Sequence, residues 1–167
     1  MRKMTEKSLN DAFAEESMAH MKYLIFSEIA EKEGYKNISR LFKAIAYAEF
    51  VHAKNHARNL GIPNDTEKNL QTGIDGETFE VEEMYPSYNA IAELQNENSA
   101  KISIHYALEA EKIHAGLYQE AKQAVASSMD IDIEDIYICP VCGYTHIGTP
   151  PEKCPVCNAS KEKFEKF

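Results

Sequence analysis

Apolar residues recur every three to four positions from about residue 8 to residue 127, in a stretch dominated by Ala, Glu, Lys, Leu and Met. This periodicity is typical of amphipathic helices that bury one face, and Gly and Pro residues interrupt it at a few points. Four helices in one core favour an antiparallel bundle with one longer connection. The first two expected helices run from Thr5 or Ser8 to Gly34 and from Asn37 to just before Gly61. The segment 64–76 is expected to grade from loop into a third helix, which Pro86 kinks or interrupts, and the fourth helix runs from about Asn98 to Ala126.

The pattern changes after residue 130, where apolar and acidic residues alternate as far as Ile138. A period of two predicts a short strand. The segment that follows contains four of the six prolines and all four cysteines. It is too short to hold a hydrophobic core unless a metal ion staples it. We therefore expect a mainly α protein with a helical bundle at 1–130 and a small metal domain at 131–167.

The composition is that of an ordinary globular protein, with 44% hydrophobic and 27% charged residues. The 18 basic and 27 acidic residues give a formal charge of −9, which argues against a basic surface for nucleic acid or an anionic membrane. No apolar run is long enough to span a bilayer, and the N-terminus does not resemble a secretory signal. Two Cys-x-x-Cys pairs then indicate a metal site in a reducing compartment, so we expect a cytoplasmic protein.

An internal repeat at an offset of 62 residues relates two parts of the helical region. The segment 48–53, Ala-Glu-Phe-Val-His-Ala, recurs at 110–115 as Ala-Glu-Lys-Ile-His-Ala, and Tyr23 matches Tyr85. Two helical hairpins of similar design explain this repeat. They place a Glu-x-x-His element on the second helix of each hairpin.

The two Glu-x-x-His elements, Glu49 with His52 and Glu111 with His114, lie within apolar stripes that face the bundle interior. A bare carboxylate there would cost on the order of several kcal/mol. Neither stripe carries a lysine or arginine close enough to neutralise the charge. A metal ion is the simplest compensating charge.

The other two helices offer further carboxylates. Glu16 lies on the apolar stripe of the first helix, whereas Glu15 lies on a mixed face, and the third helix contributes Glu77 and Glu80. The repeat offset pairs Glu77 with Glu15 instead of Glu16, and a one-residue irregularity in the third helix near Pro86 would remove this mismatch. The set predicts the carboxylate-bridged two-metal site of ferritin-like bundles, whose oxygen and imidazole ligands suit iron or manganese.

Four aromatic or imidazole side chains lie near these faces without being expected ligands. His20 and His56 are one turn beyond Glu16 and His52, and we expect them to support ligands or to face solvent. Tyr23 and Tyr85 are expected in the core, where their hydroxyls could reach a bound molecule.

The cysteines form two copies of one turn, Cys-Pro-Val-Cys-Gly-Tyr from Cys139 and Cys-Pro-Val-Cys-Asn-Ala from Cys154. Gly143 and Asn158 follow the second sulfur of each copy and tolerate a positive φ. The spacing predicts one tetrahedral tetrathiolate site. Thiolates accept zinc or iron in this geometry, and the spacing alone favours zinc.

With both sites placed, the chain resembles the rubrerythrin family along nearly its whole length. The motifs that carry the resemblance are Glu-Ser-Met-Ala-His-Met-Lys-Tyr from Glu16, Ala-Glu-Phe-Val-His-Ala from Ala48, Glu-Thr-Phe-Glu from Glu77, Glu-Met-Tyr-Pro ending at Pro86, Ala-Glu-Lys-Ile-His from Ala110, and the paired knuckles. The resemblance implies a ferritin-like four-helix bundle with a C-terminal rubredoxin-like domain. It implies a non-haem di-iron centre ligated by Glu16, Glu49, His52, Glu77, Glu80, Glu111 and His114. It replaces zinc in the tail with iron on Cys139, Cys142, Cys154 and Cys157. Relatives often carry glycine in place of Glu15 and Asn158, and neither departure removes a ligand.

The resemblance also implies a peroxidase that reduces hydrogen peroxide and protects an anaerobic microbe from oxidative stress. Electrons would come from a reduced nicotinamide through a separate reductase or rubredoxin and enter at the tetrathiolate iron. One iron would shift between Glu80 and His52 as the centre is oxidised and reduced, with Tyr23 and Tyr85 beside the metals.

The resemblance further implies a dimer or larger assembly, in which the tetrathiolate of one subunit lies close to the di-iron centre of another. The 61–73 connection is long enough to permit exchange of helices between subunits.

Two other functions remain open at this point. The bundle could oxidise and store ferrous iron as ferritins do, or the tail could be a zinc ribbon that binds a partner while the bundle acts as a scaffold. Metal content, colour and the reaction with peroxide separate the three functions.

Overall fold

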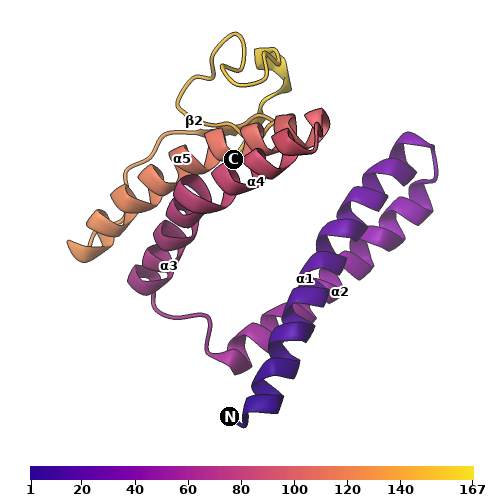
Figure 1. Cartoon of the computed structure of the whole chain (residues 1–167), viewed down its shortest axis with the longest axis vertical. Coiled ribbons are helices and arrows are strands. Elements are labelled where there is room, and N and C mark those ends of the chain that lie inside the picture. Colours follow the sequence, from indigo (N-terminus) through magenta and orange to yellow (C-terminus); the bar gives the residue numbers. More distant parts are fainter. The chain divides into compact units, whose positions relative to one another are not determined.

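A computed structural model describes the whole chain, residues 1–167, and most of it is helical (Figure 1). The helices confirm a mainly α fold of ferritin-like type, with a small cysteine-knuckle domain at the C-terminus. No helix has the length and apolar character needed to cross a membrane. In chain order the elements are α1 (Lys3–Lys32), α2 (Lys36–Leu60), α3 (Thr66–Phe79), η1 (Glu80–Met84), α4 (Tyr85–Leu94), α5 (Asn98–Ala126), β1 (Ile136–Ile138), β2 (Thr145–Ile147), η2 (Lys161–Lys163) and β3 (Glu165–Lys166).

The chain divides into two compact units, 1–64 and 65–167, and each is described here by itself. The first unit is the α1–α2 hairpin. The second contains α3, η1, α4, α5 and the cysteine-rich tail. The expected division into domains at 1–130 and 131–167 stays a prediction.

In the first unit, α1 and α2 pack along each other through small side chains. Gly34 has a φ of +87° and turns the chain between the two helices, as glycine readily does. The buried residues at the contact are Ser27, Ala30, Ser39, Ala46, Ala53 and Ala57. Small side chains let the two helix axes approach closely, and many of the larger apolar side chains of both helices stay exposed.

The second unit packs the segment α3–η1–α4 against α5. Gly73 makes this approach possible, because a Cβ at that position would lie 3.0 Å from the Tyr118 ring. Between α3 and α4 the helix widens into a π-helical turn at Glu80–Met84, directly before Pro86. A π turn inserts one extra residue into an α-helix. It supplies the irregularity that the repeat required, since Glu77 and Tyr85 are eight residues apart whereas Glu16 and Tyr23 are seven apart.

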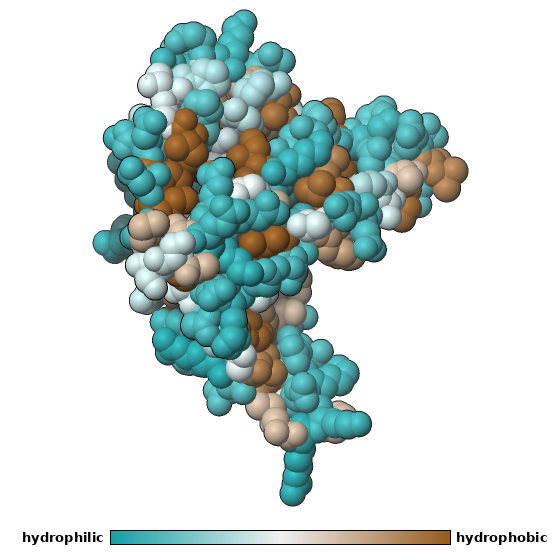
Figure 2. Space-filling view, turned by 90° about the vertical axis from the view of Figure 1, so that its left-hand side faces the viewer, coloured by the Kyte–Doolittle hydropathy of each residue, from teal (hydrophilic) through white to brown (hydrophobic).

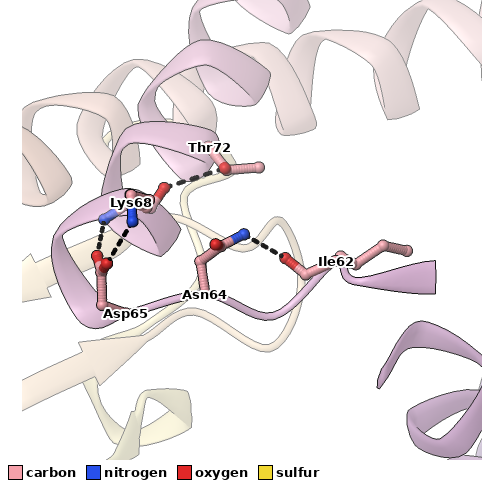
Figure 3. Close-up of polar contacts among 5 residues, drawn as sticks. All are labelled: Ile62, Asn64, Asp65, Lys68 and Thr72. Atoms are coloured by element: carbon pink, nitrogen blue, oxygen red, sulfur yellow. Dashed lines mark hydrogen bonds and ion pairs between the residues drawn. The ribbon is translucent and has the colours of Figure 1, made fainter. Parts of the chain in front are cut away.

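The connection between α2 and α3 is shorter than the sequence suggested. Gly61 ends α2 in the left-handed conformation, and α3 already begins at Thr66 because Asp65 caps it. The Asp65 carboxylate accepts a hydrogen bond of 2.9 Å from the Lys68 backbone N–H and pairs with the Lys68 Nζ at 2.7 Å (Figure 3). The segment 64–76, expected to grade from loop into helix, is therefore helical from residue 66, since the N-cap overrides the weak apolar pattern that follows it.

The tail forms a small antiparallel sheet in the order β2-β1-β3. Only Ile136–Ile138 of the alternating segment is a strand, so the expected strand begins several residues later than its pattern. In the register of β1 with β2, Ile138 lies opposite Thr145. The tail rests on α5, where Tyr106 packs against the cluster of buried cysteines.

Both units expose large apolar side chains along their helices. Figure 2 shows the hydrophobic residues as brown patches among hydrophilic ones. Exposed patches of this kind are typical of interaction surfaces. They include Ile25, Phe26, Ile29, Ile38, Leu41, Ile45, Tyr47 and Phe50 in the first unit, and Phe79, Tyr88, Ile91, Leu94 and Ile102 in the second.

Candidate metal centres

The α1–α2 hairpin gathers three of the predicted ligands. Donor atoms of Glu16, Glu49 and His52 all lie within 4.8 Å of one another. The His52 Nδ1 is 2.9 Å from a Glu49 carboxylate oxygen. The Glu49 side chain is 16% exposed and that of His52 is 54% exposed. Glu15 is exposed whereas Glu16 is half-buried, in line with the choice of Glu16 from its apolar stripe.

The second unit gathers the matching set of Glu77, Glu111 and His114, whose donor atoms also lie within 4.8 Å of one another. The His114 Nδ1 is 2.6 Å from a Glu111 oxygen and 4.0 Å from a Glu77 oxygen. Each of the three side chains is less than 30% exposed. The Glu-x-x-His repeat of the sequence is thus a repeat in geometry, with one three-donor cluster in each unit.

The carboxylates of the second cluster repel each other. Burial, a hydrogen bond with Glu111 and the charge of Glu111 together raise the pKa of Glu77 to about 7, while the charge of His114 opposes the shift. The ion pairs of Glu77 and Glu111 are with histidine, not with lysine or arginine. A half-buried like-charge pair without a strong cation is the electrostatic signature of a cation site.

Glu80 and Tyr85 lie close to this cluster although they are not part of it. Burial raises the pKa of Glu80, and the charge of Glu77 adds to the effect. Burial also raises the pKa of Tyr85, and the carboxylates of Glu80, Glu111 and Glu77 raise it further. Both side chains therefore face the acidic cluster from the π turn and the start of α4.

Tyr23 and His20 belong to the first unit. The Tyr23 ring packs against Phe26 and Phe42, with centroids 6.3 and 6.1 Å apart, and it is half-buried. The His20 Nδ1 is 2.7 Å from the Ala46 backbone oxygen. His20 thus ties α1 to α2 as a hydrogen-bond partner.

The four cysteines form a single cluster with no disulfide. The Cys139 and Cys157 sulfurs are 3.5 Å apart, as are those of Cys142 and Cys154. This is close to the edge of about 3.8 Å expected for a tetrahedron with metal–sulfur bonds of ~2.3 Å. Three of the four cysteines are buried.

The two knuckles have the same backbone geometry. The Gly143 N–H donates to the Cys139 oxygen and the Asn158 N–H to the Cys154 oxygen, each at 2.9 Å. Gly143 has a φ of +79° and Asn158 a φ of +61°, as the sequence predicted for both positions. Burial raises the pKa of the Cys142 thiol. Burial also acts to raise the pKa of Cys154, but backbone N–H groups of Cys157 and Val156 outweigh it and lower that pKa. These N–H groups stabilise thiolate, which is the form that binds metal.

Comparison with known proteins accounts for both clusters together. A family model described as rubrerythrin matches residues 7–122. The chain belongs to the rubrerythrin family. A second model, the rubredoxin-like domain of rubrerythrin, matches residues 137–165 and covers all four cysteines.

Individual rubrerythrin relatives match over almost the full length. The chain is 47% identical to rubrerythrin-2 of Clostridium acetobutylicum, and the alignment covers 98% of this chain and 97% of that protein. It is 35% identical to nigerythrin of Nitratidesulfovibrio vulgaris, with 98% and 86% covered. Among solved structures, nigerythrin in a mixed-valence state superposes with a TM-score of 0.57 at 32% identity, with 98% of this chain and 86% of that chain covered.

The donor sets fit the metals that the rubrerythrin family implies. Carboxylate oxygens and imidazole nitrogens in the helices suit iron, and four converging thiolates suit a rubredoxin-like iron. The family contains di-iron oxidative-stress proteins, and this member has the rubrerythrin-type donor groups in its helices and four cysteines in its tail.

One residue of this rubrerythrin-family site was missed by sequence reasoning. Thr145 in β2 is 5% exposed, and its Oγ1 lies 2.8 Å from the His114 Nε2. The two residues are 31 positions apart, and a threonine three positions after a cysteine carries no recognisable pattern. Only the docking of the tail on α5 reveals the contact.

Proposed function

We propose that the protein is a non-haem di-iron peroxidase that reduces hydrogen peroxide to water in the cytoplasm of an anaerobic microbe. The observation that carries the proposal is the pair of three-donor Glu-x-x-His clusters, one in each unit, in a chain that also holds a tetrathiolate cluster. The bundle metals would be held by Glu16, Glu49, His52, Glu77, Glu80, Glu111 and His114, and the tail iron by Cys139, Cys142, Cys154 and Cys157.

The overall reaction is H2O2 + 2 H⁺ + 2 e⁻ → 2 H2O. A pair of ferrous ions supplies both electrons needed to cleave the O–O bond when it is bound. The residues of the chain hold these ions, shield them from bulk water and place hydrogen-bond donors near the substrate. Tyr85 suits this last role, because its raised pKa keeps the hydroxyl protonated beside the carboxylates.

His52 and Glu80 are the proposed exchangeable ligands. The His52 ring is 54% exposed and its only side-chain hydrogen bond is with Glu49, so little restrains its motion. Glu80 lies at the first position of the π turn, and its raised pKa reflects burial near other carboxylates. A hard carboxylate favours ferric iron and a neutral imidazole suits ferrous iron, which gives the exchange a chemical basis. Tyr23 lies on the same stripe as Glu16 and is proposed to line the substrate pocket.

We propose further that two copies of the chain build each di-iron centre. Ferritin-like bundles contain a long crossover connection. Here α2 is 25 residues long, about 37 Å, whereas the connection from Leu60 to Thr66 reaches at most about 20 Å. Such a connection is too short to run the length of α2. Exchange between copies solves this, with Glu16, Glu49 and His52 from one copy and Glu77, Glu80, Glu111 and His114 from the other.

A complementation experiment tests the exchange. Glu49→Ala and Glu111→Ala chains with different tags are mixed under refolding conditions, and the mixed dimer is isolated. Exchanged hairpins create one fully intact site in that dimer, so bundle iron returns although neither variant alone binds it. A mixed dimer without bundle iron refutes the exchange and leaves the peroxidase proposal untouched.

The electron donor is proposed to be rubredoxin or an NAD(P)H-dependent reductase, which would contact the tail. The peroxidase proposal is tested by adding stoichiometric peroxide to the fully reduced protein without oxygen. Oxidation of both metal centres is expected. Glu80→Gln should slow the reaction, while the exposed neighbour variant Glu83→Gln should not.

One result would overturn the peroxidase proposal, and another would overturn the role of the tail in electron entry. One is a bundle that ignores peroxide but reacts with oxygen and accumulates a mineral core, as expected of a ferritin-like iron store. The other is a colourless tail that keeps zinc after anaerobic reconstitution with iron, because such a tail could not accept electrons.

A further inference from the structure

One face of α5 carries both the tail and a predicted metal ligand. Tyr106, Ala110 and His114 are spaced four residues apart and therefore lie on the same face of the helix. Tyr106 packs against the cysteine cluster. A Cβ built on Gly143 would lie 3.8 Å from the Ala110 Cβ, so the knuckle backbone sits directly on the helix. The tetrathiolate cluster and the Glu77–Glu111–His114 cluster are neighbours within one chain.

A hydrogen-bonded contact joins these neighbours. The His114 Nε2 lies 2.8 Å from the Thr145 Oγ1, and that Oγ1 lies 3.3 Å from the Gly143 backbone oxygen. Gly143 is bonded to Cys142, one of the four cysteines. Thr145 is 5% exposed, so water does not compete for its hydroxyl. Across the sheet it pairs with Ile138, the residue before Cys139.

The hydrogen bond from Thr145 to Gly143 favours one nitrogen of His114 as the metal ligand. A hydroxyl has one hydrogen and can accept as well. With its hydrogen directed to the Gly143 oxygen, Thr145 accepts a hydrogen bond from Nε2–H of His114. The lone pair of that imidazole is then on Nδ1, the nitrogen that faces Glu111 and Glu77.

We propose that Thr145 is a positioning residue that holds His114 in the metal-binding tautomer and links the tetrathiolate knuckle to the metal cluster of its own chain. This proposal rests on the peroxidase function proposed above. The link would lie on the electron-entry route proposed above, in which the tail iron would give up one electron (ferrous to ferric) and one bundle iron would accept it (ferric to ferrous). No bond forms or breaks in this step. The electron is replaced by the external rubredoxin or reductase.

The other Glu-x-x-His element lacks such a link. His52 has the same relation to Glu49 as His114 has to Glu111, but its ring is 54% exposed against 29% for His114. The two repeats therefore differ in restraint. His114 is anchored by the tail, and His52 is free to change its position.

The test compares Thr145→Val, which removes the hydroxyl and keeps the shape, with Thr145→Ser, which keeps the hydroxyl. Thr149→Val serves as the control, because Thr149 is an exposed threonine of the same tail. The first readout needs no catalysis. In zinc-loaded, ¹⁵N-labelled protein, long-range ¹H–¹⁵N spectra report the protonated nitrogen of His114 and the exchange rate of its N–H.

Thr145→Val should accelerate exchange of the His114 Nε2–H by about fivefold or more, the effect of losing one hydrogen bond. Thr145→Ser should restore slow exchange, and Thr149→Val should match wild type. Unchanged exchange in Thr145→Val overturns the positioning role whatever the protein does with peroxide.

The second readout is the return of the visible tetrathiolate band after one equivalent of peroxide is mixed with reduced protein. We expect the return to slow by about fivefold or more in Thr145→Val and to recover in Thr145→Ser. An equal rate in wild type and Thr145→Val overturns the electron-entry link. If the wild-type band itself does not return although the bundle irons are oxidised, the electron-entry role of the tail fails; if the bundle irons stay reduced, the peroxidase proposal fails. In both cases the exchange measurement still decides the role of Thr145.

Discussion

Replacing Glu77 with Gln should make the metal-free protein more stable and should weaken metal binding. Glu77 lies beside Glu111 in a half-buried site without a lysine or arginine partner, and its pKa is raised to about 7 from an ordinary value of 4.5. Glutamine keeps the shape and removes the charge. It also removes a donor that the metal requires, so the two effects have opposite signs.

The size of the stability effect follows from the pKa. A rise from 4.5 to about 7 corresponds to an upper limit of about 3.5 kcal/mol, at ~1.4 kcal/mol for each pH unit. The Glu77 side chain is 19% exposed, and screening by solvent reduces the effect to about 1–2 kcal/mol.

The sign follows from proton binding. Between pH 4.5 and about 7 the folded protein holds more protons than the unfolded chain at this site. Its free energy of unfolding therefore falls as the pH rises through this window.

Urea unfolding at pH 5 and pH 8, followed by circular dichroism at one protein concentration, measures this effect. The samples are full chains from which a mild chelator has removed the bundle metals while the visible band shows that the tail remains loaded. Glu77→Gln should gain about 1–2 kcal/mol over wild type at pH 8 and clearly less at pH 5. The bundle of this variant should bind less iron than the bundle of the wild-type protein.

Glu120→Gln is the matched control, since Glu120 is an exposed residue of α5 in the same unit. It should change neither the pH dependence nor the iron content. A Glu77→Gln protein that is no more stable than wild type at pH 8 would refute the like-charge argument. Full retention of bundle iron would refute the assignment of Glu77 as a ligand.

Three further outcomes are expected from single substitutions. Glu111→Ala should lose the bundle iron and keep the visible band of the tail, as measured by iron analysis and absorption. Asp65→Ala should lower the free energy of unfolding by about 1 kcal/mol, because it removes the N-cap of α3; an unchanged urea midpoint would contradict this. In the tail, Gly143→Ala should release the metal to a chelator faster because φ is positive there, and Asn158→Gly should slow the release. If both variants change the rate of metal release in the same direction, backbone strain does not control that rate.

The sequence predicted most of the helical structure and the clustering of the cysteines and of both Glu-x-x-His elements because their signals are local. Apolar periodicity located α5 at Asn98–Ala126, as observed. The paired knuckles follow from residue spacing and from the tolerance of Gly143 and Asn158 for a positive φ. A one-residue irregularity near Pro86 was invoked to remove the mismatch of the repeat, and the π turn at Glu80–Met84 is such an irregularity.

Other features depend on contacts that no local pattern encodes. The sequence placed the start of α3 too late. The N-cap at Asp65 stabilises the helix more than the polar, glycine-containing sequence after it destabilises it. The strand expected from residue 130 begins only at Ile136, because alternation of apolar and acidic residues needs a partner strand to become a sheet. The role of Thr145 could not be predicted for the same reason, because its partner His114 lies 31 positions away.

The π turn at Glu80–Met84 has a consequence for the ancestry of the protein. A duplicated hairpin should give a site with equal numbers of ligands from each half. The residues that match Glu80 in the first hairpin are Met18 at an offset of 62 and Ala19 at 61, and neither can bind a hard metal ion. The π turn, which contains the extra residue, begins at Glu80, the carboxylate that has no counterpart in the first hairpin. The extra residue of the third helix thus coincides with the one proposed ligand that has no counterpart in the first hairpin. If Glu80 binds metal as proposed, the two metal positions would be unequal, and one ion could change ligands while the other stays fixed.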